Sequence, residues 1–108
     1  MLITESYSPD TDEWTEMPSM TTKRSAMGCV AHDGSIYVCG GYDGALSINT
    51  CEMYNNEVGE WKRISNMNKA RSALAVTSFQ GSVHVLGGHD GLSIFNSVEC
   101  YDQVCFHL

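Results

Sequence analysis

The sequence predicts an all-β protein built from a repeated unit of four short antiparallel strands. Three observations lead to this fold class. The chain of 108 residues repeats itself with a period of 47 residues. Turn-forming residues recur about every 8–12 residues, which is typical of all-β sheets. No capping box leads into an apolar stripe with the period of a helix.

The internal repeat is most visible in three tyrosines, Tyr7, Tyr54 and Tyr101, which lie 47 residues apart. From residue 5 to residue 51, 16 of 47 positions are identical to the residue 47 places further on, without a gap. Matching pairs include Trp14 with Trp61, Arg24 with Arg71, and Gly40-Gly41 with Gly87-Gly88. Such self-similarity indicates a supersecondary unit that stacks on copies of itself.

The first unit is expected to be partial. Residues 1–22 supply only its third and fourth strands, at 3–7 and 13–17, because Tyr7 and Trp14 occupy the positions that Tyr54 and Trp61 hold in the next unit. The chain therefore begins inside a unit of the repeat.

The complete unit covers residues 23–69. Its first strand is expected at 26–31, a small and apolar run that ends at the turn His32-Asp33-Gly34. Its second strand is expected at 36–39, where β-branched and aromatic residues precede a double glycine. Both runs have the composition and the turn boundaries of strands.

The outer two strands of the complete unit are expected at 48–54 and 60–64. The first ends at the polar run Asn55-Asn56-Glu57, and the second has Trp61 at its centre. The last unit, residues 70–102, is expected to hold only three strands, and residues 103–108 form an atypical C-terminal tail. These last strands are expected at 72–78, 82–86 and 96–101.

Several residues recur at fixed offsets around the double glycines. In the complete unit they are Arg24-Ser25, Gly34, residues 36–44 (Ile-Tyr-Val-Cys-Gly-Gly-Tyr-Asp-Gly), Glu52-x-Tyr54 and Trp61. In the last unit they are Arg71-Ser72, Gly81, Gly87-Gly88-His89-Asp90-Gly91 and Glu99-x-Tyr101. This pattern resembles a kelch repeat over nearly the whole chain, and its Asp-Gly form is most similar to the Kelch-like proteins.

The resemblance implies a partial β-propeller, in which each unit is one four-stranded antiparallel blade and about six blades close a full ring. In this family the propeller is a protein-interaction module that recognises substrates for cullin-3 ubiquitin ligases. A protein or peptide partner, such as a ubiquitination substrate, is therefore expected. The BTB and BACK domains that bind the cullin are expected to be absent from this chain.

The recurring residues have expected structural roles. Double glycines permit positive φ and close backbone approach, and the resemblance implies that the recurring aromatic rings pack between neighbouring blades. The recurring Arg and Glu suggest a partly buried ion pair. The structural residues are Gly40, Gly41, Gly87, Gly88, Tyr7, Tyr54, Tyr101, Trp14, Trp61, Arg24, Arg71, Glu52 and Glu99.

Partner-binding residues are also implied by the resemblance, because kelch propellers that bind peptides use the loops at one rim. The positions are the residue after the double glycine, the residue five further on, and the serine that follows the arginine. They correspond to Ser25, Tyr42 and Ser47 in one blade and to Ser72, His89 and Ile94 in the next. Loops on rigid scaffolds carry function in many folds.

Composition excludes several classes of protein. The chain has 13 acidic and 6 basic residues and a formal charge of −7, which argues against nucleic-acid binding. No apolar run reaches the roughly 20 residues of a membrane span, and no secretion signal is visible. The 5 cysteines include no C-x-x-C pair, so we expect reduced thiols and a cytoplasmic location.

No catalytic, metal or cofactor motif is found, so the chain is not expected to be an enzyme. Asp43 and Asp90 occupy identical turns, which favours capping of the turn backbone over a calcium site. Two alternatives stay open: a truncated fragment without function of its own, and part of an oxidoreductase that resembles the copper-containing kelch enzymes. Open blade edges also predict self-association.

Overall fold

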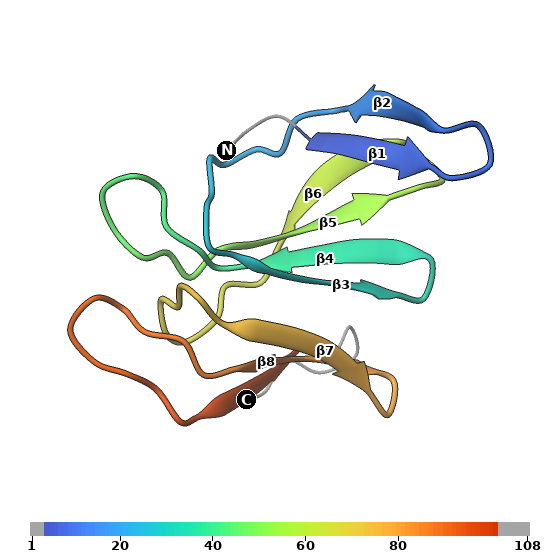
Figure 1. The fold of residues 1–108 in the computed structure, drawn as a ribbon. Coiled ribbons are helices and arrows are strands. Elements are labelled where there is room, and N and C mark those ends of the chain that lie inside the picture. The colour runs from blue at the N-terminus through green and yellow to red at the C-terminus, as the bar shows by residue number, and fades with distance from the viewer. Residues whose placement is uncertain (1–3, 102–108) are drawn as a thin grey trace.

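The computed structural model describes residues 4–101, which form three antiparallel sheets (Figure 1). The first sheet contains β1 (Thr4–Ser8) and β2 (Glu13–Met17). The second contains β3 (Gly28–His32), β4 (Ser35–Cys39), β5 (Cys51–Asn55) and β6 (Glu60–Ile64). The third contains β7 (Ala75–Phe79), β8 (Ser82–Leu86) and β9 (Val98–Tyr101). The expected tail at 103–108, with Cys105, lies outside the described residues.

Each sheet is a meander whose strand order follows the chain order. In the second sheet Gly28 faces Cys39, Cys39 faces Cys51, and Cys51 faces Ile64. The prediction of an all-β fold made of antiparallel units is confirmed. Within residues 4–101 there is no helix long and apolar enough to cross a membrane.

The first strand of each unit begins later than the sequence predicts. β3 begins at Gly28 rather than at residue 26, and β7 begins at Ala75 rather than at residue 72. Ala26 and Ala73 have φ values of 54° and 53°, in the left-handed region that breaks an extended strand. The chain therefore turns at these alanines before it enters the sheet.

The third strand of the complete unit also begins late, at Cys51 rather than at residue 48. The backbone before it also makes hydrogen bonds outside the β4–β5 ladder. The Ile48 N–H donates to the Gly41 carbonyl at 2.9 Å, and the Thr50 carbonyl accepts the Arg24 guanidinium at 2.7 Å. Because buried backbone groups must find partners, these bonds fix residues 48–50 as the base of a loop.

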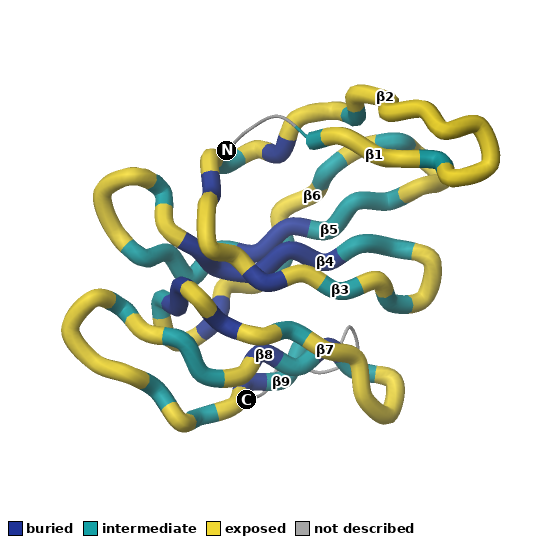
Figure 2. Tube along the Cα trace, in the orientation of Figure 1, coloured by how far each residue is buried: buried dark blue, intermediate teal, exposed yellow. Residues whose placement is uncertain are grey.

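The second and third sheets stack face to face, with β3 against β7 (Figures 1 and 2). The buried core lies between them and contains Cys39, Cys51, Met67, Leu74 and Val85, with Ile64 and Val76 at its border. The hydrophobic core is therefore an interface between units, as stacking of repeats requires.

The recurring aromatic rings do not all pack between sheets, which corrects the expectation for the first unit. Tyr7 and Trp14 are 45% and 68% exposed, and their ring centroids lie 5.2 Å apart. They are register partners on β1 and β2, so each ring covers the other. Among the described residues the first sheet consists of these two strands alone.

Of the other recurring aromatic residues, some pack within their own sheet and one packs between two sheets. Tyr54 and Trp61 also form a cross-strand pair, with centroids 5.3 Å apart, and the Trp61 indole N–H donates to the Pro18 carbonyl at 2.8 Å. Tyr101 of β9 lies against Tyr37 of β4, with centroids 6.0 Å apart. Tyr101 therefore joins the second and third sheets, whereas Tyr54 packs within its own sheet.

Candidate functional site

Two long loops leave the same end of the second and third sheets (Figure 1). Residues 40–50 connect β4 to β5, and residues 87–97 connect β8 to β9. The connections 18–27 and 65–74 lie at this end too, whereas short turns join the strands at the other end (Figure 1). We call the end that carries the two long loops the rim.

The six predicted partner-binding residues occupy the rim as two equivalent sets. Ser25 pairs with Tyr42, and Tyr42 pairs with Ser47, through isolated antiparallel bridges. The backbones of Ser25 and Tyr42 exchange two hydrogen bonds, of 2.9 and 2.7 Å. The same bridges join the other set, Ser72, His89 and Ile94. Each set is therefore a small ladder that holds its loop in place.

Hydrogen bonds join the two ladders to each other. The hydroxyl oxygens of Ser47 and Ser72 lie 3.0 Å apart, and the Gly41 N–H donates to the Arg71 carbonyl at 2.8 Å. Ser72 is only 3% exposed and also donates to the His89 carbonyl. Ser72 therefore positions its neighbours and does not itself offer surface to a partner.

The exposed part of the rim includes several apolar side chains beside polar ones such as Ser25 and His89. Tyr42 is 42% exposed and Ile94 is 90% exposed. Leu46 and Leu92 are also exposed, at 70% and 96%, and Figure 2 shows exposed residues at the tips of both loops. The recurring positions around the double glycines do not include these two leucines. Their place in a loop between a glycine and the next strand is the signal that marks them.

A buried ion pair anchors the first loop. Arg24 and Glu52 are both 0% exposed, and the Arg24 guanidinium lies 3.0 Å from the Glu52 carboxylate. Arg24 also donates to the carbonyls of Gly40 and Thr50, at the two ends of the loop. The predicted pair is therefore present, and it is fully rather than partly buried.

The next unit repeats this anchor. Arg71 lies 3.1 Å from Glu99 and donates to the carbonyls of Gly87 and Ser97, each at 2.9 Å. The Arg71 guanidinium also lies 5.3 Å from the centre of the Phe95 ring. Both rim loops are thus held at both ends by an arginine that is itself held by a glutamate.

The loop tips are closed by aspartates. The Asp43 carboxylate accepts the N–H groups of Leu46 at 2.8 Å and Ala45 at 2.9 Å. Asp90 accepts the N–H groups of Ser93 and Leu92 at 2.8 and 2.9 Å. These bonds hold the pKa of both carboxyl groups below the usual range. No cluster of three potential metal-ligating side chains occurs among residues 4–101.

Comparison with known proteins agrees with this geometry. The sequence model of the kelch motif matches residues 23–68 and 70–105. The chain belongs to the kelch-repeat family. Human Kelch-like protein 5 is 44% identical over 46 residues, which are 43% of this chain and 6% of that protein. Human Kelch-like protein 28 is 45% identical over 40 residues, which are 37% of this chain and 7% of that protein.

Kelch-like protein 23 of Pongo abelii is 48% identical over 40 residues, which are 37% of this chain and 7% of that protein. The chain thus spans only a small part of the relatives that it matches. The first matched motif contains the four-stranded second sheet, which is one blade, and the second matched motif contains the three-stranded third sheet.

The rim loop of residues 40–50 is expected to loosen in acid. Because folding lowers the pKa of Asp43, its carboxylate stabilises the loop above the pKa of the unfolded chain, and this contribution is lost as pH falls through the folded pKa. We expect the amide resonances of Ala45 and Leu46 to shift below about pH 4, and this titration to vanish in Asp43→Ala. Titration of these amides at the pH of an aspartate in an unstructured peptide would contradict the account.

Proposed function

We propose that this chain is a protein-interaction module, in which the rim of two successive kelch blades binds an apolar segment of a partner protein. One observation carries the proposal. Two repeated and mutually bonded ladders present Tyr42, Leu46, Leu92 and Ile94 to solvent at one end of the molecule. Large exposed apolar side chains that gather at one end of a folded protein are typical of an interaction site.

The rigidity of the rim supports binding. Each loop is held at both ends by an arginine and at its tip by an aspartate. A preorganised surface loses little conformational entropy when a partner binds, so more of the interaction energy appears as affinity. Burial of exposed apolar side chains contributes about 25 cal/mol per Å² removed from water.

The finer part of the proposal follows from the resemblance to the Kelch-like proteins. We propose that the rim recognises a substrate of a cullin-3 ubiquitin ligase, in the cytoplasm. The role assigned to this segment is recognition, and the cullin would be bound by BTB and BACK domains. The four free cysteines among the described residues fit a reducing compartment.

One further surface supports the predicted self-association. Leu86 and Val98 are register partners in the third sheet, at the positions that Cys39 and Cys51 occupy in the second. The cysteines are covered by the next blade, whereas Leu86 is 36% and Val98 is 51% exposed. A second copy of the chain would cover this face as a following blade does.

The experiment that tests rim binding starts from a displayed peptide library. Peptides that bind the 108-residue chain are selected from this library. We expect Ile94→Ser and Leu92→Ser each to weaken binding about tenfold, or about 1.4 kcal/mol, because each removes apolar area at the contact. Val58→Ser is the matched control, since Val58 is also exposed, at 62%, but lies in a turn at the opposite end.

Calorimetric titration of each variant with the selected peptides measures the effect. Loss of binding in the two rim variants with retention in the control supports the proposal. Equal binding by all three variants, or a loss that is confined to Val58→Ser, would place the interaction elsewhere and overturn it.

A further inference from the structure

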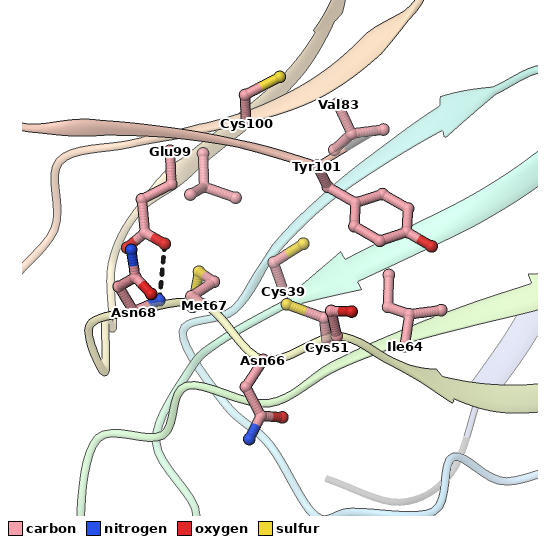
Figure 3. Close-up of a pocket in the computed structure, with 12 residues that line it drawn as sticks. Cys39, Cys51, Ile64, Asn66, Met67, Asn68, Val83, Glu99, Cys100 and Tyr101 are labelled. Atoms are coloured by element: carbon pink, nitrogen blue, oxygen red, sulfur yellow. Dashed lines mark hydrogen bonds between the residues drawn. The ribbon is translucent and has the colours of Figure 1, made fainter. Parts of the chain in front are cut away.

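A cavity of about 250 Å³ lies between the second and third sheets, beside the base of the rim loop 40–50. Its walls include Ile64, Met67 and Val85, and the side chains of Cys39 and Cys51 enter it from neighbouring strands (Figure 3). Cys100 lies on the opposite wall with its sulfur turned away from the other two (Figure 3). One water occupies about 30 Å³ in the liquid, so this space admits small polar molecules.

Cys39 and Cys51 are direct register partners on β4 and β5. The adjacent pair on this ladder is hydrogen-bonded, since the Gly40 N–H donates to the Thr50 carbonyl at 3.0 Å. Pairs alternate in an antiparallel ladder, so the two cysteines form a non-hydrogen-bonded pair, with Cα atoms about 4.5 Å apart. This separation lies within the range of about 4.4–6.8 Å that a disulfide spans.

Packing does not require thiols at these positions. The repeat places Leu86 and Val98 at the equivalent positions of the third sheet, where they are also register partners. An aliphatic pair therefore builds the same ladder in the following blade. The cysteine pair is a feature of the second blade alone among the described strands.

The two thiols are not equivalent. The Cys39 S–H donates a hydrogen bond to the Cys51 sulfur, and this bond, with burial, raises the pKa of Cys39. The same bond lowers the pKa of Cys51, and the positive charge of Arg24 and the Gly40 N–H act in the same direction, against the effect of burial. The positive charge of Arg24 favours the thiolate of either cysteine, and the Gly40 N–H contacts Cys51 alone. Nucleophilic reaction of a cysteine proceeds through the thiolate.

We propose that Cys39 and Cys51 are a redox modification site, at which a small hydroperoxide converts the two thiols to a cross-strand disulfide. The Cys51 sulfur attacks one peroxide oxygen, the O–O bond breaks, and Cys51 becomes a sulfenic acid while water leaves. The Cys39 sulfur then attacks the Cys51 sulfur, the S–S bond forms, and a second water leaves. Two thiols and one hydrogen peroxide thus yield one disulfide and two waters.

The position of this disulfide gives it a structural consequence. Cys39 ends β4 and Cys51 begins β5, so the new bond closes the loop 40–50 at its base. This loop carries Tyr42, Leu46 and Ser47 of the rim. The effect of the disulfide on partner binding rests on the proposed function, whereas formation of the disulfide does not.

Peptide mapping tests bond formation on the whole chain. Cleavage before each aspartate separates all five cysteines, because Asp33, Asp43, Asp90 and Asp102 lie between successive cysteines. The chain is treated with one equivalent of hydrogen peroxide, its remaining thiols are alkylated under denaturing conditions, and the digest is analysed without reductant. We expect peptide 33–42 linked to peptide 43–89, lighter than their sum by two hydrogen atoms, and separable by reductant.

Two comparisons make the test selective. Cys29→Ser, which removes an exposed thiol, is expected to leave the linkage unchanged. Oxidation of the chain in guanidinium is expected to replace the single linkage by a mixture, because the ladder no longer sets the pairing. Linkage of the native chain mainly through Cys29, Cys100 or Cys105, or full alkylation of both Cys39 and Cys51 after peroxide, would overturn the proposal.

Discussion

Replacement of Arg24 by alanine is expected to lower the free energy of unfolding by about 3–5 kcal/mol, because it leaves a buried charge without its partner. Glu52 is 0% exposed and would keep only the backbone N–H groups of Thr21 and Thr22 as donors. The carbonyls of Gly40 and Thr50 would also lose the Arg24 guanidinium as a donor, and the Gly40 N–H would remain as a donor to Thr50. Urea unfolding followed by circular dichroism measures the change.

Arg63→Ala is the matched control for the buried arginine. Arg63 is exposed and donates to the hydroxyl of Thr22 at 3.1 Å. Its removal is expected to cost about 0–1 kcal/mol, as for other exposed polar contacts. An Arg24→Ala variant that is unfolded from the start agrees with the prediction as long as Arg63→Ala stays folded. Equal stability of the two variants would contradict it.

The second large effect is expected at Gly41. Its φ is 110°, and a Cβ atom there would lie 2.6 Å from the Ser25 carbonyl oxygen. That carbonyl is fixed because it accepts the Tyr42 N–H at 2.7 Å. Gly41→Ala therefore adds a steric clash to the cost of a positive φ, and the bulkier Gly41→Val is expected to unfold the blade.

Gly44 is the control that isolates the cost of a positive φ from the cost of the steric clash. Its φ is 103°, and a Cβ atom there would meet nothing within 4 Å. Gly44→Ala is expected to cost about 1–2 kcal/mol, the penalty for an L-residue with positive φ. Gly41→Ala is expected to cost about 1–3 kcal/mol more, as overpacking does. Thermal and urea unfolding of both variants measures the difference. Similar stabilities would show that the clash is absent.

The next blade offers an independent copy of this comparison. A Cβ atom on Gly88 would lie 2.6 Å from the Ser72 carbonyl oxygen, whereas one on Gly91 would meet nothing within 4 Å. We expect the same order of stabilities for Gly88→Ala and Gly91→Ala. Glycines at equivalent positions of the two units are therefore expected to respond alike to substitution by alanine.

The period of 47 residues made the fold predictable, because each strand could be located from its counterpart in another unit. Strand starts were not predictable. Ala26 carries no preference for the left-handed region, and the rim bonds of Ser25 hold the chain there. Tertiary contacts override local preference at such positions.

The candidate site could be predicted in part. The positions Tyr42 and His89 follow from the double glycine, and the resemblance implied their place at the rim. The burial of Ser72 depends on its contact with Ser47 of the preceding blade, and a single sequence does not reveal contacts between units. The pairing of Cys39 with Cys51 depends in the same way on strand register.

The most direct test of rim binding uses the isotope-labelled chain and a selected peptide. Amide chemical shifts are recorded as the peptide is added. We expect shifts concentrated in residues 42–47 and 89–94, where the two loops carry exposed apolar side chains. Shifts confined to β1 and β2, or to the turns at the opposite end of the sheets, with both rim loops unchanged, would contradict it.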